Sequence, residues 1–244
     1  MSALQRGFDH ARSVDVSRPR IAAAICVHGA GGGAWEWALW RGVFEAAGLA
    51  CLAIELQPAA GGLASTRFDD YVDQVHAAVA HAPRPRALIG ASLGGLLALR
   101  CAEEADALVL VNALPPAPWA LQLPARTSPD VVAWGADARL ASTRRALPDA
   151  DEATVIEAMR RWRDESGQVL REARAGIRTV PPRCPVLCLA SGLDDDVPAA
   201  LTADLAAALG ADLMRYPTLG HVDPLLGRSA ANIAAAVAAW LAQR

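Results

Sequence analysis

The segment that decides the fold is Ala87–Leu99, which reads ALIGASLGGLLAL. Its first four residues form a short apolar run that ends in glycine, as buried strands do, and the residues from Leu93 onward favour a helix. Ser92 lies between them in Gly-x-Ser-x-Gly spacing, where the flanking glycines leave room that a Cβ would fill. This pattern predicts a tight strand-to-helix turn that raises the serine hydroxyl above the sheet, beside a helix N-terminus that stabilises negative charge.

The rest of the chain alternates between buried strands and helices. The apolar runs that predict strands are Ile21–Val27, Ala50–Leu56, Ala87–Gly90, Ala107–Val111, Val186–Ala190 and Asp212–Tyr216. The segments that predict helices are Trp35–Ala47, Phe68–His81, Leu93–Glu104, Pro198–Leu209 and a final stretch from about Ser229 to Ala242. Strands and helices in this rhythm indicate the α/β class, with a doubly wound, mostly parallel sheet.

The alternation breaks between residues 115 and 180. Four prolines between Pro115 and Pro124 exclude another core strand, and Ser128–Leu140 and Glu152–Ala175 favour helices. A helical insertion in such a sheet typically covers the carboxyl ends of the strands, where these sheets bind ligands. We therefore expect one domain over residues 1–244, with a core of 1–114 and 181–244 and a helical cap of 115–180.

Composition narrows the class of protein. Hydrophobic residues make up 53% of the chain and the net charge is -3, which disfavours a nucleic-acid partner. No apolar run reaches the length of a membrane span, and the N-terminus around Arg6, Asp9, His10 and Arg12 lacks the apolar stretch of a secretory signal. The chain has no lysine, so lysine-dependent phosphate loops, Schiff bases and Ser–Lys dyads are excluded. A cytoplasmic protein is expected, and the sequence carries no signal for its oligomeric state.

A serine nucleophile needs a base, and His221 is the best candidate among five histidines. It follows the last predicted strand, which brings it to the same sheet edge as Ser92. An acidic residue should lie between them in chain order to orient the imidazole. The loop after Val186–Ala190 offers Asp194, Asp195 and Asp196, of which Asp195 is preferred and Asp194 is the second choice.

The segment His28–Ala34 reads HGAGGGA and admits two interpretations. In the first, its backbone N–H groups stabilise an oxyanion, with Ala30 as the first donor, Gly31 as the next, and the N–H of Leu93 as the other half of the hole. In the second, Gly29-x-Gly31-x-x-Ala34 is a dinucleotide fingerprint, and Glu55 stands at the position that binds a ribose. The oxyanion interpretation also accounts for Ser92 and His221, so it is preferred.

Taken in order, the loop at His28–Gly31, the turn at Gly90–Gly95, the acidic loop at Gly192–Pro198 and Gly220-His221 resemble the α/β-hydrolase superfamily. The resemblance implies an eight-stranded parent sheet, a helical cap and no cofactor, and no metal site is expected. The short N-terminal region departs from it, because it leaves little room for the first two strands. His28-Gly29-Ala30 with the nearby tryptophans is similar to the small esterase and hydroxynitrile-lyase branch.

These residues predict a serine hydrolase that cleaves a carboxylic ester or thioester of a small, largely apolar substrate through an acyl-enzyme on Ser92. Trp35 and Trp119 are expected to contact the substrate, with Trp37, Trp134 and Trp162 as further aromatic candidates. The alternatives are a lyase of the hydroxynitrile-lyase type with the same three residues, an NAD(P)-dependent dehydrogenase that uses Gly29–Ala34, and a ligand receptor without catalysis.

Overall fold

The computed structural model describes residues 20–244, so the N-terminal residues Arg6, Asp9, His10 and Arg12 lie outside it. Six strands form one sheet in the order β2-β1-β3-β4-β7-β8, and every pair is parallel. The strands are β1 (Ala23–Val27), β2 (Ala50–Ile54), β3 (Arg86–Ala91), β4 (Ala107–Val111), β7 (Val186–Ser191) and β8 (Asp212–Tyr216). The predicted α/β class and mostly parallel sheet are confirmed, with six strands where the resemblance implied an eight-stranded parent.

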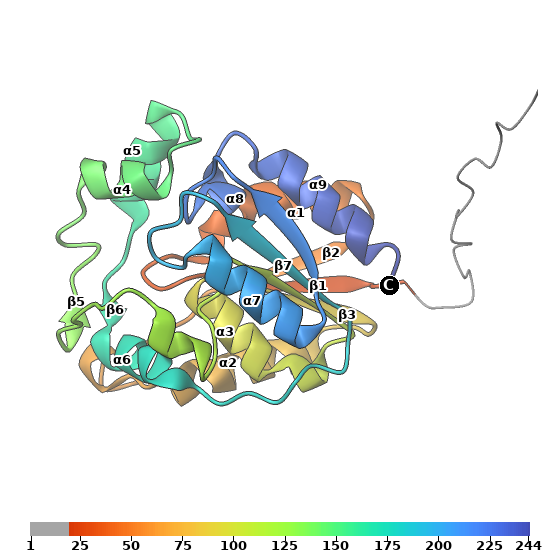
Figure 1. The fold of residues 1–244 in the computed structure, drawn as a ribbon, viewed down its shortest axis with the longest axis horizontal. Coiled ribbons are helices and arrows are strands. Elements are labelled where there is room, and N and C mark those ends of the chain that lie inside the picture. Colours follow the sequence, from red (N-terminus) through yellow and green to blue (C-terminus); the bar gives the residue numbers. More distant parts are fainter. Residues whose placement is uncertain (1–19) are drawn as a thin grey trace, which may run out of the picture.

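Helices cover both faces of the sheet because its central strands are apolar on both sides. Within β1, Ile25 belongs to one buried cluster and Cys26 to the other, as the alternation of side chains along a strand requires. One cluster packs under α2 (Phe68–His81), α3 (Leu93–Arg100) and α7 (Ala199–Leu209). The other packs under α1 (Ala38–Ala46) and α9 (Ala230–Leu241), and Figure 1 shows these two layers on opposite faces of the sheet.

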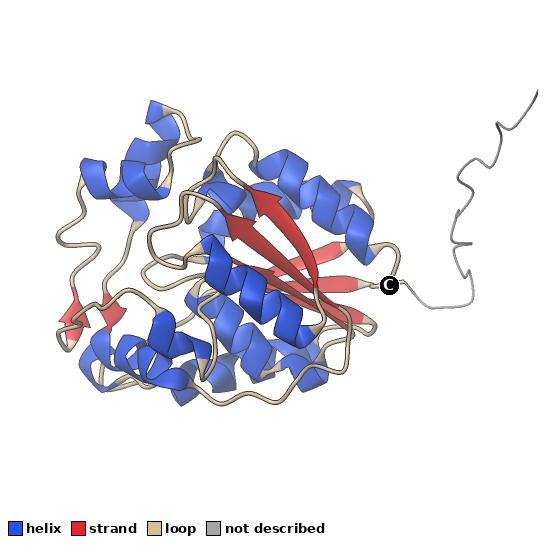
Figure 2. Ribbon diagram, in the orientation of Figure 1, coloured by secondary structure: helices blue, strands red, loops and turns tan. Residues whose placement is uncertain are grey.

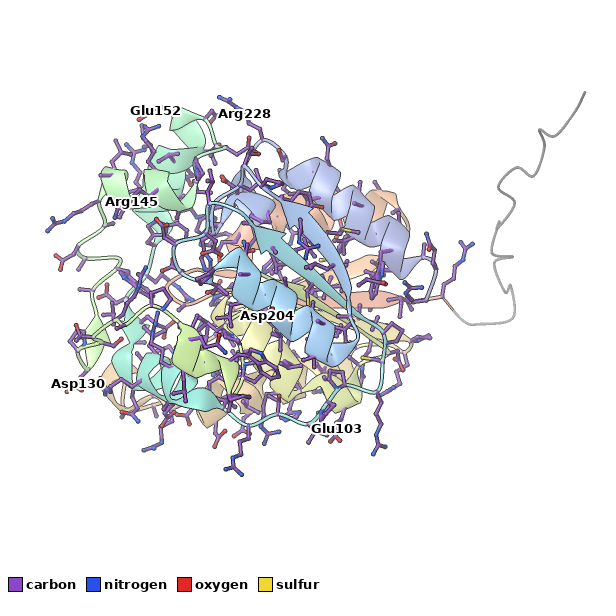
Figure 3. All side chains as sticks on the ribbon, viewed as in Figure 1. Glu103, Asp130, Arg145, Glu152, Asp204 and Arg228 are labelled. Carbon is purple, nitrogen blue, oxygen red and sulfur yellow. The ribbon has the colours of Figure 1, made fainter. Side chains whose placement is uncertain are left out.

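Residues 115–180, called the cap below, lie between β4 and β7 in the chain, on the side toward which the strand arrows point (Figures 1 and 2). The cap contains η4 (Trp119–Gln122), α4 (Leu140–Ala146), α5 (Glu152–Arg161) and α6 (Gly167–Gly176). It also contains a small antiparallel pair, β5 (Val131–Val132) with β6 (Glu165–Ser166). Figure 3 labels two residues of the cap, Asp130 beside β5 and Arg145 on α4.

Two helix predictions within the cap are wrong. Residues 128–139 are not helical, and the helix expected over Glu152–Ala175 is interrupted at residues 162–166. The interruption has a tertiary cause: the N–H of Arg163 donates to Gly31 O at 2.7 Å, and β6 pairs with β5. These contacts with distant segments outweigh the helical preference of the local sequence.

Among the described residues, no helix is both long and apolar enough to cross a membrane. All five cysteines are free, and Cys26, Cys101 and Cys188 are buried.

The turn at Ser92 is held by close backbone contacts. Ser92 has φ 52° and ψ -118°, a conformation that an L-residue rarely adopts. A Cβ on Gly90 would lie 2.1 Å from Gly94 O, one on Gly94 would lie 2.3 Å from Val27 O, and one on Gly95 would lie 2.3 Å from Ala113 Cβ. Helix α3 therefore begins against the ends of β1 and β4, and only glycine fits where the backbones meet.

This packing predicts that Gly94→Ala lowers the free energy of unfolding by at least about 2 kcal/mol, because the new methyl group meets rigid backbone. The matched control is Gly42→Ala in α1, where a Cβ meets nothing within 4 Å. That change should stabilise the protein by about 0.5–1 kcal/mol, as Gly→Ala does in exposed helices. Urea unfolding measures both, and equal effects would contradict the steric argument.

Candidate active site

The carboxyl ends of the strands open into a cavity of about 400 Å³ beneath the cap. Core residues that line it include Ala30, Ser92 and His221. The cap contributes Val132, Trp134, Trp162 and Leu170, together with four arginines. Three segments far apart in sequence thus meet at one enclosed space, at the edge where open α/β sheets bind ligands.

Ser92 enters this cavity from the turn between β3 and α3. Its own N–H donates to Val111 O at 3.0 Å, which ties the turn to the end of β4. The next N–H, on Leu93, is the first of α3 and has no acceptor among the described residues. A helix N-terminus with a free N–H therefore stands directly beside the Ser92 hydroxyl.

His221 pairs with Asp194, the second choice, and not with the preferred Asp195. Nδ1 of His221 lies 2.7 Å from Oδ2 of Asp194, whose side chain is fully buried. The other oxygen of Asp194 accepts the N–H groups of Asp196 and Val197, both at 2.8 Å. Because Asp194 caps its own turn in this way, its second oxygen is directed at the histidine, and Asp195 stands exposed at the cavity wall.

The carboxylates around His221 favour its charged form. Burial by itself would lower its pKa, but the ion pair and hydrogen bond with Asp194, helped by Asp196 and Glu36, raise the pKa of His221 to about 9. Asp196 in turn is paired with Arg126, whose Nη2 lies 2.5 Å from its Oδ1.

Asn112 is a site residue that the sequence reasoning missed. Its Nδ2 donates to the backbone oxygen of His221 at 2.8 Å and to Ser191 Oγ at 2.9 Å, while its Oδ1 accepts the Ser191 N–H at 2.9 Å. Asn112 has φ 44° and stands directly after β4, so it connects the ends of β4 and β7 to the histidine loop. The signal in the sequence was an amide side chain immediately after a buried strand.

The cap fixes the histidine loop through Asp223, which is fully buried. Its Oδ2 accepts the Gly220 N–H at 2.7 Å, and its Oδ1 accepts the Asp149 N–H of the cap at 3.1 Å. Val222 N–H donates to Ala146 O at 3.0 Å, so the two residues that follow His221 are both bonded to the cap.

The loop after β1 lies close to Ser92, and only one of its two predicted oxyanion donors is free. A Cβ on Gly29 would lie 3.1 Å from Ser92 Cβ, so the loop packs against the turn. Gly31 N–H donates to buried Glu165 Oε2 at 3.0 Å, which corrects the expectation that Gly31 serves as a donor. Ala30 N–H has no acceptor among the described residues, and Ala30 lines the same cavity as Ser92.

Arg163 and Glu165, at the break between α5 and α6, hold this loop in place. Arg163 donates its N–H to Gly31 O and its Nε–H to Gly32 O, both at 2.7 Å. Glu165 receives Gly31 N–H and also the Tyr71 hydroxyl at 2.8 Å. These residues, like Asn112, carry no motif in the sequence; their importance arises only from contacts between distant segments.

Two further titratable groups adjoin the loop. His28 is buried, its Nδ1 lies 2.8 Å from Gly29 O, and its Nε2 accepts Leu56 N–H at 3.0 Å. Burial lowers the pKa of His28 to about 4, so it is neutral and serves the loop's structure. Glu36 lines the cavity, and burial raises its pKa to about 8, although its Oε2 accepts Gly33 N–H at 3.2 Å.

The loop does not fit the dinucleotide interpretation. A pyrophosphate needs free backbone N–H groups at the start of the helix. Here Gly31, Gly33 and Ala34 donate to the carboxylates of Glu165, Glu36 and Glu55 respectively. Glu55, the proposed ribose ligand, is also paired with Arg163 at 2.5 Å.

The two tryptophans predicted to contact the substrate do not line the cavity. Trp35 packs against Trp162 with ring centroids 5.6 Å apart, and Arg161 lies over its other side. Trp119 packs against the core cluster under α2, α3 and α7, and Trp37 is fully buried. The aromatic lining comes instead from Trp134 and Trp162 of the cap.

Among the described residues, one group has the composition of a metal site: ligand atoms of Asp194, Asp196 and His221 lie within 4.8 Å of one another. Each of these side chains already has a partner within the chain, since Asp194 forms a hydrogen bond with His221 and Asp196 forms an ion pair with Arg126. The donor set is therefore part of an ion-pair network within the chain, and we assign it no metal.

The sequence profile of the alpha/beta hydrolase family matches residues 24–236, which include every site residue described above. The chain belongs to the alpha/beta hydrolase family. The resemblance inferred from the sequence motifs is thereby confirmed. No curated protein matches the chain in sequence.

Solved structures of the same fold are similar across most of this alpha/beta hydrolase. Polyneuridine aldehyde esterase is 18% identical with a TM-score of 0.70, covering 89% of this chain and 99% of its own. A pyrethroid hydrolase from Sphingobium faniae is 19% identical with a TM-score of 0.67, covering 91% and 97%. Tomato methylketone synthase I, complexed with 2-tridecanone, is 14% identical with a TM-score of 0.71, covering 92% and 99%.

The charge of Glu36 predicts that replacing this residue changes the pH dependence of kcat/KM. A neutral imidazole is the form that accepts a proton, so kcat/KM should rise with pH to a midpoint near 9, set by the raised pKa of His221. Glu36 is ionised at that pH and helps to hold the proton on His221. Glu36→Gln should therefore move the midpoint to lower pH, with its largest effect above pH 8, where Glu36 of the wild type is charged.

The control for Glu36 is Asp137→Asn, which removes a carboxylate from the exposed part of the cavity wall. Its pH profile of ester hydrolysis should match that of the wild type. A midpoint for Glu36→Gln that is unchanged or higher would show that Glu36 does not act on His221.

The contacts of Arg163 predict a loss in turnover. Arg163→Met removes the bond to Gly32 O and the pair with Glu55, so the loop that carries Ala30 loses its support. We expect kcat for ester hydrolysis to fall about 10- to 100-fold with little change in KM, because a displaced oxyanion donor costs transition-state stabilisation. Arg161→Met removes a contact with the Trp35 ring and an exposed ion pair with Glu157, and it should leave kcat near the wild-type value. Equal losses in the two variants would contradict this role of Arg163.

Proposed function

We propose that this protein is a serine hydrolase that cleaves a carboxylic ester or thioester of a small substrate through an acyl-enzyme on Ser92. The observation that carries the proposal is the buried Asp194–His221 pair, which shares a cavity with Ser92 in its strained turn. A base oriented by a buried carboxylate and an exposed hydroxyl at a helix N-terminus are the parts that acyl transfer requires.

In the proposed mechanism, His221 takes the proton of Ser92 as its Oγ attacks the ester carbonyl. Asp194 accepts a hydrogen bond from Nδ1 of His221, which leaves Nε2 as the base and stabilises the imidazolium that forms. The free N–H groups of Ala30 and Leu93 stabilise the oxyanion. His221 then returns the proton to the leaving alcohol or thiol and activates water, which releases the acid and regenerates Ser92.

The surroundings support this chemistry. The cavity volume of about 400 Å³ suits a small molecule, and Trp134, Trp162, Leu114 and Leu170 give it an apolar wall. Three structures of the same fold carry the names polyneuridine aldehyde esterase, methylesterase and pyrethroid hydrolase, which agrees with an ester substrate. With this proposal we expect a cytoplasmic enzyme that acts on a small molecule and needs no cofactor.

The proposal predicts that a fluorophosphonate probe labels Ser92, and that Ser92→Ala abolishes both labelling and hydrolysis of p-nitrophenyl esters. Mass spectrometry of the labelled peptide identifies the residue. Labelling that survives Ser92→Ala would refute the nucleophile. Release of an aldehyde from cyanohydrins without a trappable acyl-enzyme would favour the lyase alternative.

The neighbouring aspartates provide a matched pair of variants. Asp194→Asn should lower kcat about 10³- to 10⁴-fold, because the imidazole loses the carboxylate that orients it. Asp195→Asn should change kcat by less than about twofold, since an exposed substitution of this kind is nearly neutral. Steady-state hydrolysis of p-nitrophenyl butyrate measures both, and a larger loss at Asp195 would restore it as the orienting acid.

A further inference from the structure

Four arginines line the cavity, all of them from the cap, and the proposed hydrolysis uses none of them. They are Arg126, Arg139, Arg145 and Arg174. Arg126, Arg139 and Arg145 are exposed, whereas Arg174 is half-buried. A half-buried guanidinium group loses part of its hydration, so a pocket for a purely apolar ester gives no reason to place Arg174 on its wall. Their partners therefore indicate what the cavity accepts.

Arg126 and Arg174 share a single carboxylate. Arg126 is paired with Asp196 at 2.5 Å. Arg174, from α6, donates through Nη1 to the Pro124 backbone oxygen at 2.8 Å and pairs with no carboxylate among the described residues. Burial and the nearby charge of Arg126 lower the pKa of Arg174, while Asp196 opposes this effect. Two cations and one anion thus form a cluster with one unbalanced positive charge.

This cluster adjoins the catalytic residues. The carboxylate of Asp196 lies within 4.8 Å of ligand atoms of both Asp194 and His221. Arg126, Arg174 and Asp196 line the same cavity as Ser92. An anionic group held by Arg174 therefore belongs to a molecule that also reaches the serine.

The other acidic groups of the cavity do not balance Arg174. The pKa of Glu36 is raised to about 8, so it is mostly protonated at pH 7. Asp137 and Asp195 are exposed, where water screens their charge. Arg174 is thus a half-buried guanidinium group on the cavity wall, and its planar donors match a carboxylate.

We propose that the substrate is an ester that carries a carboxylate, which Arg174 binds with the help of Arg126 while Ser92 attacks the ester carbonyl. This inference rests on the proposed hydrolase function. It replaces a largely apolar substrate by one that is apolar in its middle and anionic at one end.

The experiment compares pairs of esters that differ only in charge. One pair is p-nitrophenyl hydrogen adipate and its methyl ester, with the anion on the acyl half. The other is p-butyryloxybenzoic acid and its methyl ester, with the anion on the alcohol half. For at least one pair, the wild type should have kcat/KM about tenfold higher for the anion, as expected of one charge-assisted contact, and added salt should reduce that preference.

Three variants assign the preference to Arg174. Arg174→Gln should remove it while kcat/KM for the neutral esters stays within about twofold, and Arg174→Lys should restore part of it. Arg160→Gln, on the exposed side of α5 outside the cavity, changes the net charge equally and should keep the preference.

The outcomes separate this inference from the hydrolase function. Ser92-dependent hydrolysis of neutral esters without preference for either anion would overturn the carboxylate and leave the hydrolase intact. A preference that survives Arg174→Gln, or that disappears in Arg145→Gln instead, would also overturn the assignment. Failure to hydrolyse any of the esters would refute the hydrolase function itself.

Discussion

The structure depends on one close approach: the first turn of α3 packs directly against the ends of β1 and β4. Glycines at positions 90, 94 and 95 allow this contact, since a Cβ at any of them would lie within 2.3 Å of another atom. The cost is a strained Ser92, with φ at 52°. The result is a hydroxyl raised above the sheet, a free N–H on Leu93 beside it, and a neighbouring loop close enough to supply another.

The cap does more than cover this edge. Its return segment bonds to the backbone of residues 31 and 32 through Arg163 and Glu165, and its α4–α5 connection bonds to the loop around His221 through Asp223. The loop after β1 and the loop that carries His221, to which we assign the oxyanion donor and the base in our proposal, are therefore each fixed by cap contacts. Any movement of the cap that admits a substrate must preserve these contacts or change the geometry of the site with them.

Charge in the cavity is distributed unevenly. Carboxylates gather around His221 and raise its pKa, whereas the arginines come from the cap. Asp196 connects the two groups, because it adds to the negative field on His221 and also pairs with Arg126. Because Asp196 is paired with Arg126, Arg174 has no carboxylate partner of its own among the described residues.

The sequence by itself determined the parallel sheet, and it placed Ser92 and His221, the two main candidates for the site, at one edge of it. The predicted bounds of Ala107–Val111 and Asp212–Tyr216 match those of β4 and β8. For Ala107–Val111 the reason is a continuous apolar run, which is typical of a strand buried on both faces. Ser92 and His221 followed from strand ends that share one edge. Only the tertiary structure decided the rest. It pairs Asp194, and not Asp195, with His221, and it leaves the N–H of Ala30, and not that of Gly31, without an acceptor. It also puts Trp134 in the cavity wall in place of Trp119 and breaks the predicted helix at Arg163. Each of these outcomes depends on the direction of a side chain or an N–H after distant segments have met. Hydrogen bonds between loops set that direction, and they produce no periodic pattern in the sequence.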